Sequence, residues 1–102
     1  MAIQIERVAK LANFITSISS SYNRRHLVYT GITDDISRRL REHGINEEDT
    51  ADYTFEKCDS SNEARETEEY IKTRYCTDGD SGGGNDNSCY IYSYRKKSGT
   101  TP

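Results

Sequence analysis

The chain has 102 residues, which is near the usual size of one domain, and no polar stretch is long enough to link two cores. Leu, Ile, Val and Phe together number only 16 residues, a share that would indicate disorder if the net charge were large, but the net charge is −3. With a pI of about 5.4, the chain has no global attraction to nucleic acid, so DNA binding would need a local basic surface. We therefore expect one folded domain without tight, non-specific affinity for DNA.

Tyrosines partly compensate for the small number of Leu, Ile, Val and Phe residues. The chain has eight of them, and a tyrosine ring buries substantial area while its hydroxyl keeps a polar partner. We therefore expect a thin, tyrosine-rich core. Because small domains bury a smaller fraction of their surface, stability should be modest, and a homodimer is an open alternative that would add burial.

The sequence indicates neither secretion nor membrane insertion. No run of about 18 apolar residues occurs, and the N-terminal segment lacks a secretory hydrophobic region. The three cysteines, Cys58, Cys76 and Cys89, cannot all pair, and none has the Cys-x-x-Cys or Cys-x-x-His spacing of zinc sites. We expect reduced thiols in a cytoplasmic protein.

In the first half of the chain, spacing and turn residues predict helix, strand and helix. Apolar residues recur at three and four positions from residue 3 to about 19, which predicts a helix. Residues 26–30 are rich in β-formers and predict a strand. The acidic pair Asp34-Asp35 can begin a second helix that runs to His43, with Gly44 as its stop.

In the second half, residues 53–57 alternate aromatic with polar side chains and predict a half-buried strand. Ser60 and Glu63 have the spacing of a capping box, which predicts a helix over residues 62–75. Residues 77–88 contain four glycines and no apolar residue, so we expect a mobile loop. Residues 89–95 alternate and predict a strand, and residues 96–102 are expected to fray.

The order helix, strand, helix, strand, helix, strand predicts a small α/β domain of the α+β class. We expect about three strands in a mainly antiparallel sheet flanked by helices. The helical connections leave parallel pairing open.

One segment carries a recognisable signature. A strand ending in Tyr29-Thr30-Gly31 runs into a helix with Arg39-Leu40, and His43 follows Arg39 by one helical turn. This segment resembles the second half of the signature of the GIY-YIG nuclease superfamily, in which a strand ending in Tyr-x-Gly precedes a helix with an arginine and then often a histidine.

The resemblance extends to the third predicted helix. Residues 64–72 fit the pattern Ala-x-x-x-Glu-x-x-Ile-Lys, in which the glutamate of the family corresponds to Glu68. The match covers residues 26–75. It implies a small antiparallel sheet flanked by helices and a DNA endonuclease that hydrolyses phosphodiester bonds with one divalent metal ion.

The resemblance also implies roles for the matched residues. Glu68 would hold Mg²⁺ or Mn²⁺, Arg39 would clamp a phosphate oxygen, and Tyr29 would position or activate water. His43 is a further candidate catalytic residue. These residue types suit phosphodiester hydrolysis, which needs charge stabilisation in the transition state and a positioned nucleophilic oxygen.

The first Gly-Ile-Tyr tripeptide of the family is missing. Its place before Tyr29 falls in residues 14–21, which contain no tyrosine and lie mostly in the first predicted helix. The C-terminal strand offers a substitute, because Ile91-Tyr92 resembles the end of the tripeptide. We therefore expect this strand to pair with residues 26–31 and to bring Tyr92 near Tyr29 as a catalytic residue. The family's late asparagine would correspond to Asn85 or Asn87.

Structural explanations remain open for each candidate. Tyr29 could be a packed strand aromatic, Arg39 a solvated helix residue, and His43 a partner of the helix dipole. Glu68 could pair with Arg65 or Lys72 on the surface.

Three further hypotheses come from the C-terminal region. Tyr90, Tyr92 and Tyr94 could stack on exposed bases, although a packed aromatic face explains the same alternation. The glycine-rich segment lacks the pattern of a phosphate loop and the terminal glutamate of a calcium loop. The alternative to a nuclease is a catalytically inactive relative that binds nucleic acid or protein.

Overall fold

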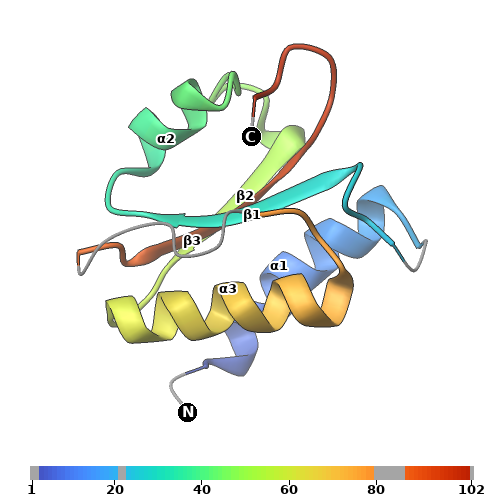
Figure 1. Cartoon of the computed structure of the whole chain (residues 1–102). Coiled ribbons are helices and arrows are strands. Elements are labelled where there is room, and N and C mark those ends of the chain that lie inside the picture. The colour runs from blue at the N-terminus through green and yellow to red at the C-terminus, as the bar shows by residue number, and fades with distance from the viewer. Residues whose placement is uncertain (1–2, 21–22, 80–86, 102) are drawn as a thin grey trace.

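A three-stranded sheet separates two helical layers in the computed structural model of the chain, which describes residues 3–20, 23–79 and 87–101 (Figure 1). Helix α2 covers one face, and helices α1 and α3 cover the other (Figure 1). The elements in chain order are α1 (Ile5–Ile18), β1 (Val28–Thr33), α2 (Ile36–Glu42), the 3₁₀ turn η1 (Thr50–Asp52), β2 (Tyr53–Lys57), α3 (Ser61–Tyr75) and β3 (Tyr90–Arg95). The α+β prediction is confirmed.

The last strand of the chain occupies the middle of the sheet. The strand order is β1-β3-β2, and both pairings are antiparallel, so the parallel alternative is excluded. Tyr92 stands opposite Gly31 on one side and Phe55 on the other. The expected pairing of the C-terminal strand with the Tyr29 strand is therefore confirmed.

Local sequence signals begin and end the helices as expected. The Asp35 carboxylate accepts a hydrogen bond from the Arg38 amide at 3.1 Å and caps α2. Gly44, which follows this helix, has a φ of +84°. The Ser60 hydroxyl accepts from the Glu63 amide at 3.1 Å and caps α3, so this part of the capping box is confirmed.

Strand β1 begins two residues later than the sequence indicates. The backbone amides of Leu27 and Val28 both donate to the Arg24 carbonyl, at 2.9 and 3.0 Å. This turn removes residues 26 and 27 from the strand, whereas Ile32 and Thr33 extend it. The β-forming side chains of residues 26–30 correctly predicted a strand, but they placed its first residue too early in the chain.

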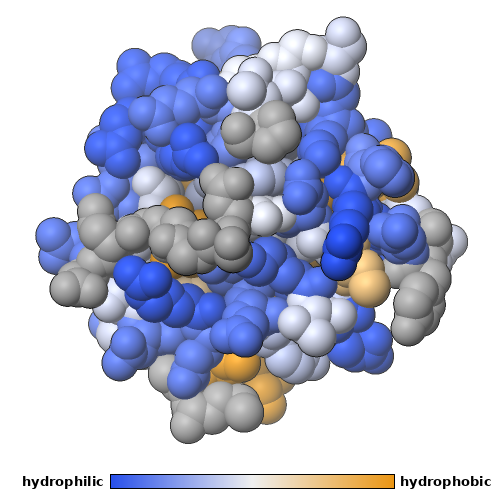
Figure 2. Space-filling view, in the orientation of Figure 1, coloured by the Kyte–Doolittle hydropathy of each residue, from blue (hydrophilic) through white to orange (hydrophobic). Residues whose placement is uncertain are grey.

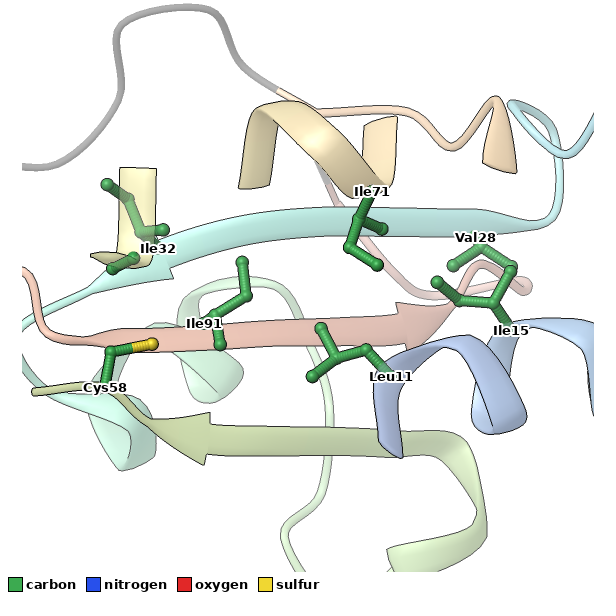
Figure 3. Packing of buried hydrophobic residues seen from close by; sticks show 8 residues of the cluster. Leu11, Ile15, Val28, Ile32, Cys58, Ile71 and Ile91 are labelled. Atoms are coloured by element: carbon green, nitrogen blue, oxygen red, sulfur yellow. The ribbon is translucent and has the colours of Figure 1, made fainter. Parts of the chain in front are cut away.

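The core has two parts, one on each face of the sheet. Leu11 and Ile15 of α1, Ile71 of α3 and Ile91 of β3 pack together on the face covered by the two long helices (Figure 3). On the α2 face, a second cluster is built mainly from tyrosines. The expected tyrosine-rich core is therefore confirmed, and it is confined to one layer.

A buried ion pair ties α1 to the start of α3. Glu63 is 1% exposed, and its carboxylate accepts from the Arg7 guanidinium at 2.5 Å and from the Asp59 amide at 2.8 Å. Arg7 also contacts Asp59 at 3.2 Å. The hydrogen bonds that Arg7 donates to Glu63 and Asp59 raise the pKa of Arg7 above its usual value, so Arg7 stays charged.

Two segments that we expected to be mobile or frayed have defined partners. Asp78 pairs with the outer edge of β1, because its amide donates to the Val28 carbonyl and its carbonyl accepts from the Thr30 amide, both at 2.8 Å. Within the predicted glycine-rich loop, residues 80–86 lie outside the described residues.

The C-terminal segment turns back onto α2 instead of fraying, at least through residue 101. The Thr101 amide donates to the His43 carbonyl at 2.8 Å. Gly99, at a φ of +95°, makes this return possible. The backbone segments at Gly44 and Gly99 approach so closely that a Cβ on Gly44 would lie 2.5 Å from the Gly99 carbonyl oxygen.

The surface of the face in Figure 2 is mostly hydrophilic, with small apolar patches. Across the described residues, no helix is both long and apolar enough to cross a membrane.

The packing of α1 predicts that substitutions at two of its residues have very different effects on the free energy of unfolding. Leu11 is 0% exposed and Ile5 is 83% exposed. Leu11→Ala should lower the free energy of unfolding by about 2–5 kcal/mol because it leaves a cavity, whereas Ile5→Ala should change it by less than about 0.5 kcal/mol. Chemical denaturation followed by circular dichroism measures both values. Equal effects of the two substitutions would contradict the assigned packing of α1.

Candidate functional site

Three tyrosines lie side by side on the α2 face of the sheet. Tyr29 comes from β1, and Tyr92 and Tyr94 come from β3, at 2%, 1% and 0% exposure. The Tyr29 ring centroid lies 5.1 Å from that of Tyr94 and 6.3 Å from that of Tyr92, and both pairs are stacked. Alternation along the two paired strands brings these side chains to one face. The predicted proximity of Tyr92 to Tyr29 is confirmed at the level of the rings.

Gly31 makes room for the Tyr92 hydroxyl. A Cβ at this position would lie 2.7 Å from Tyr92 Oη, closer than Cβ atoms approach other atoms, and 3.1 Å from Tyr29 Cε1, which is tighter than most Cβ contacts. Gly31 faces Tyr92 in the register, so the missing Cβ leaves the space that the phenol end occupies. The glycine of the Tyr29-Thr30-Gly31 tripeptide therefore has a steric function in this cluster.

His43 joins the tyrosines from the end of α2. Its ring is 0% exposed and lies 4.7 Å, centroid to centroid, from both Tyr29 and Tyr94. Nδ1 lies 2.6 Å from the Thr101 carbonyl oxygen, and Nε2 lies 2.7 Å from Tyr92 Oη. A carbonyl oxygen only accepts, so Nδ1 carries the proton and Nε2 accepts the hydrogen bond that the Tyr92 hydroxyl donates.

Arg39 lies at the border of this cluster. Its side chain is 28% exposed and donates to Glu42 at 3.2 Å, whereas Arg38 and Arg41 are exposed, as expected from the helical spacing. Burial acts to lower the pKa of Arg39, but the nearby Tyr92 phenol and the Glu42 carboxylate outweigh it and raise the pKa above its usual value. Arg39 therefore remains a cation beside the phenol.

The Tyr92 hydroxyl is held in its protonated form. Burial raises the pKa of Tyr92 above its usual value, Tyr29 adds to the increase, and Arg39 opposes it. The same oxygen thus faces a hydrogen-bond acceptor in His43 and a cation in Arg39. This arrangement gives the phenol proton a route to Nε2 and places a positive charge where a phenolate would form.

Glu68 belongs to the opposite helical layer. It lies on α3, which contacts β1 on the face away from α2, and its side chain is 8% exposed. The structure thus brings Tyr29, Arg39, His43 and Tyr92 into one cluster, whereas α3, the helix that carries Glu68, lies on the other side of the sheet (Figure 1). β1 is an edge strand of the described sheet, and Asp78 pairs with its outer edge.

Burial rules out one of the sequence hypotheses. Tyr92 and Tyr94 are 1% and 0% exposed, so neither ring offers a face on which a base could stack. Among residues 3–20, 23–79 and 87–101, no group of three His, Cys, Asp or Glu side chains could hold a metal ion. Asn87 is exposed, and Asn85 lies outside the described residues.

Sequence reasoning placed Tyr94 on the face of Tyr92 but did not assign it to the candidate site, and it did not identify Thr101. The Tyr94 hydroxyl donates to the Thr101 carbonyl at 3.3 Å, and this carbonyl also fixes the His43 ring. The alternation of residues 89–95 placed Tyr94 on the correct face, so that signal was available. Thr101 contacts His43 and Tyr94 through its backbone oxygen, which any residue would supply, so the residue type at this position gives no signal.

No protein-family model, curated protein or solved structure matches this chain. The resemblance to GIY-YIG nucleases is therefore an expectation that comes from the motif residues alone.

Steric coupling between Gly31 and Tyr92 is directly testable. Gly31→Ala should lower the free energy of unfolding by about 1–3 kcal/mol, because the new methyl group collides with the phenol. In a Tyr92→Phe background, the same change should cost less, since the nearest atom has been removed. A double-mutant cycle by chemical denaturation should give a coupling of about 1 kcal/mol. Additive costs would show that Gly31 does not accommodate the Tyr92 hydroxyl.

Proposed function

We propose that this chain is a divergent GIY-YIG-like endonuclease that hydrolyses phosphodiester bonds in DNA with one divalent metal ion. The observation that carries the proposal is the position of the Tyr92 hydroxyl, which lies opposite Gly31 and between His43 Nε2 and Arg39. A phenol with both a proton acceptor and a cation is equipped for proton transfer.

The cluster supports a defined division of roles. A water molecule activated at Tyr92 would pass its proton to the phenol oxygen as the phenol proton transfers along the 2.7 Å hydrogen bond to His43 Nε2. The Thr101 carbonyl accepts from Nδ1 and would stabilise the resulting imidazolium. Arg39 would bind a non-bridging phosphate oxygen, and Tyr29 would position the water.

Glu68 fits a metal that makes few protein contacts. Mg²⁺ usually keeps several waters and takes one or two carboxylates together with phosphate oxygens of the substrate. Glu68 supplies such a carboxylate from α3, the helix that contacts β1. When bound, the ion would polarise the scissile phosphate and offset charge in the transition state.

A second candidate function follows from burial. Tyr29, Tyr92 and His43 are at most 2% exposed, which is expected of a polar core that holds the fold together. In that case the chain is a catalytically inactive relative that binds nucleic acid or protein. The two candidates differ in whether DNA is cut.

Metal dependence distinguishes the two functions. The purified chain should nick supercoiled plasmid with Mg²⁺ or Mn²⁺ and not with EDTA. Glu68→Ala and Arg39→Ala should each lower the rate by roughly 100-fold or more. Arg38→Ala is the matched control, because Arg38 is exposed and pairs with Asp34 at 2.8 Å. Full activity of Glu68→Ala would refute the metal assignment. A wild type that cuts no DNA form but shifts DNA probes at low salt would support the binding function.

The role of Tyr92 has its own matched control. Tyr92→Phe should lower the nicking rate by about 100-fold, since it removes the proton that His43 accepts. Tyr90→Phe changes the same strand and face but lies outside the cluster, and its rate should stay within about twofold of wild type. Circular dichroism should show that both variants are folded. Similar rates for the two variants would remove Tyr92 from the catalytic centre.

A further inference from the structure

Two of the three cysteines stand opposite each other where β2 and β3 meet. The last pair in the register of these strands is Lys57 with Tyr90, so the next residues outward are Cys58 and Cys89. The pairing continues for this one step, because the Cys58 amide donates to the Cys89 carbonyl at 2.6 Å. The two cysteines are therefore a cross-strand pair, although neither is near the other in sequence.

The side chains of this pair share one face of the sheet. Cys58 is 4% exposed and packs in the cluster under α1 and α3 together with Ile91 (Figure 3). Cys89 is two residues before Ile91, so alternation directs it to the same face. Residues in a hydrogen-bonded antiparallel pair have Cα atoms about 5.5 Å apart, and disulfides form over roughly 4.4–6.8 Å. Both thiols are free.

We propose that Cys58 and Cys89 form a reversible disulfide in response to low-molecular-weight disulfides of the glutathione type. The pair has opposite positions and a common face, and its backbone hydrogen bond puts it in the class of antiparallel pairs whose usual Cα separation suits a disulfide.

The two thiols have unequal reactivity. Cys89 is half-buried, whereas Cys58 is buried. Burial raises the pKa of Cys58 to about 12, and the hydrogen bond to Glu63 and the proximity of Cys89 add to the increase. Since the thiolate is the nucleophile, Cys89 reacts first with the external disulfide, and Cys58 acts as the resolving thiol.

The exchange balances without any further reagent. The Cys89 thiolate attacks one sulfur of glutathione disulfide, breaks its S–S bond and releases one glutathione. Cys58 then loses its proton and attacks the Cys89 sulfur, which forms the Cys58–Cys89 bond and releases the second glutathione. Two protein thiols are oxidised and one glutathione disulfide is reduced to two thiols. Excess reduced glutathione reverses both steps.

Cys76 provides an internal control. It ends α3 in the left-handed conformation, at a φ of 55°, and it belongs to neither strand of the cross-strand pair. Its Sγ contacts the Thr73 carbonyl at 4.0 Å. A selective reaction of the pair should leave this thiol free.

The Cys58–Cys89 disulfide would join the two ends of the chain segment that contains α3. Residues 58–89 include the whole of this helix, which is otherwise connected to the sheet by two backbone segments. Tying the ends together lowers the entropy of the unfolded chain, so the oxidised form should melt at a higher temperature by on the order of 10 °C.

Oxidation of the full reduced chain with glutathione disulfide tests the proposal. After alkylation of free thiols, peptide mapping should find Cys58 linked to Cys89 and Cys76 alkylated, and dithiothreitol should restore three free thiols. Cys76→Ser should oxidise like the wild type, and Cys89→Ser should form no internal disulfide. Thermal melting should show the higher stability of the oxidised chain.

Three outcomes would overturn the assignment: a disulfide that includes Cys76, disulfide-linked dimers, or Cys58 and Cys89 thiols that both remain free in excess glutathione disulfide. Because the peptide map uses the wild-type chain, the result does not depend on how well any variant folds.

Discussion

The central position of β3 is the constraint on which the rest of the structure depends. Among the described strands, β1 and β2 each pair with β3 and not with each other. Its side chains also contribute to both layers of the core, since Ile91 faces α1 and α3 whereas Tyr92 and Tyr94 face α2. Removing this one strand would leave two isolated strands and two helical layers without a common surface.

The α2 layer shows how a chain with few aliphatic residues completes a core. Tyrosine rings supply apolar area, but each buried hydroxyl needs a partner. His43 and the Thr101 carbonyl satisfy the hydroxyls of Tyr92 and Tyr94. The return of the C-terminal segment over α2 is therefore part of the core and not an appendage. The polar atoms that make the cluster a candidate catalytic centre are the same atoms that allow it to be buried.

Local features of the fold could be predicted from sequence, whereas partners distant in sequence could not. Asp35 and Ser60 cap helices through atoms three residues away, so spacing alone identifies them. His43 and Thr101 are separated by 58 positions, and the residue type of Thr101 does not matter to the bond. The Ile91-Tyr92 pair indicated the neighbour of β1 only because a known motif suggested an incomplete strand. Spacing on α2 identified Arg39, but spacing on α3 could not place Glu68 in a layer relative to it.

The placement of β3 also determines when the sheet can form during synthesis of the chain. β1 and β2 leave the ribosome first, and both must wait with unpaired edges until residues 90–95 have followed. Pairing across more than 60 residues, as between Tyr29 and Tyr94, favours slow folding because a long loop must close before the contact forms. A chain of this topology therefore keeps strand edges of β1 and β2 unpaired until β3 has been made, which favours intermolecular pairing of those edges before folding is complete.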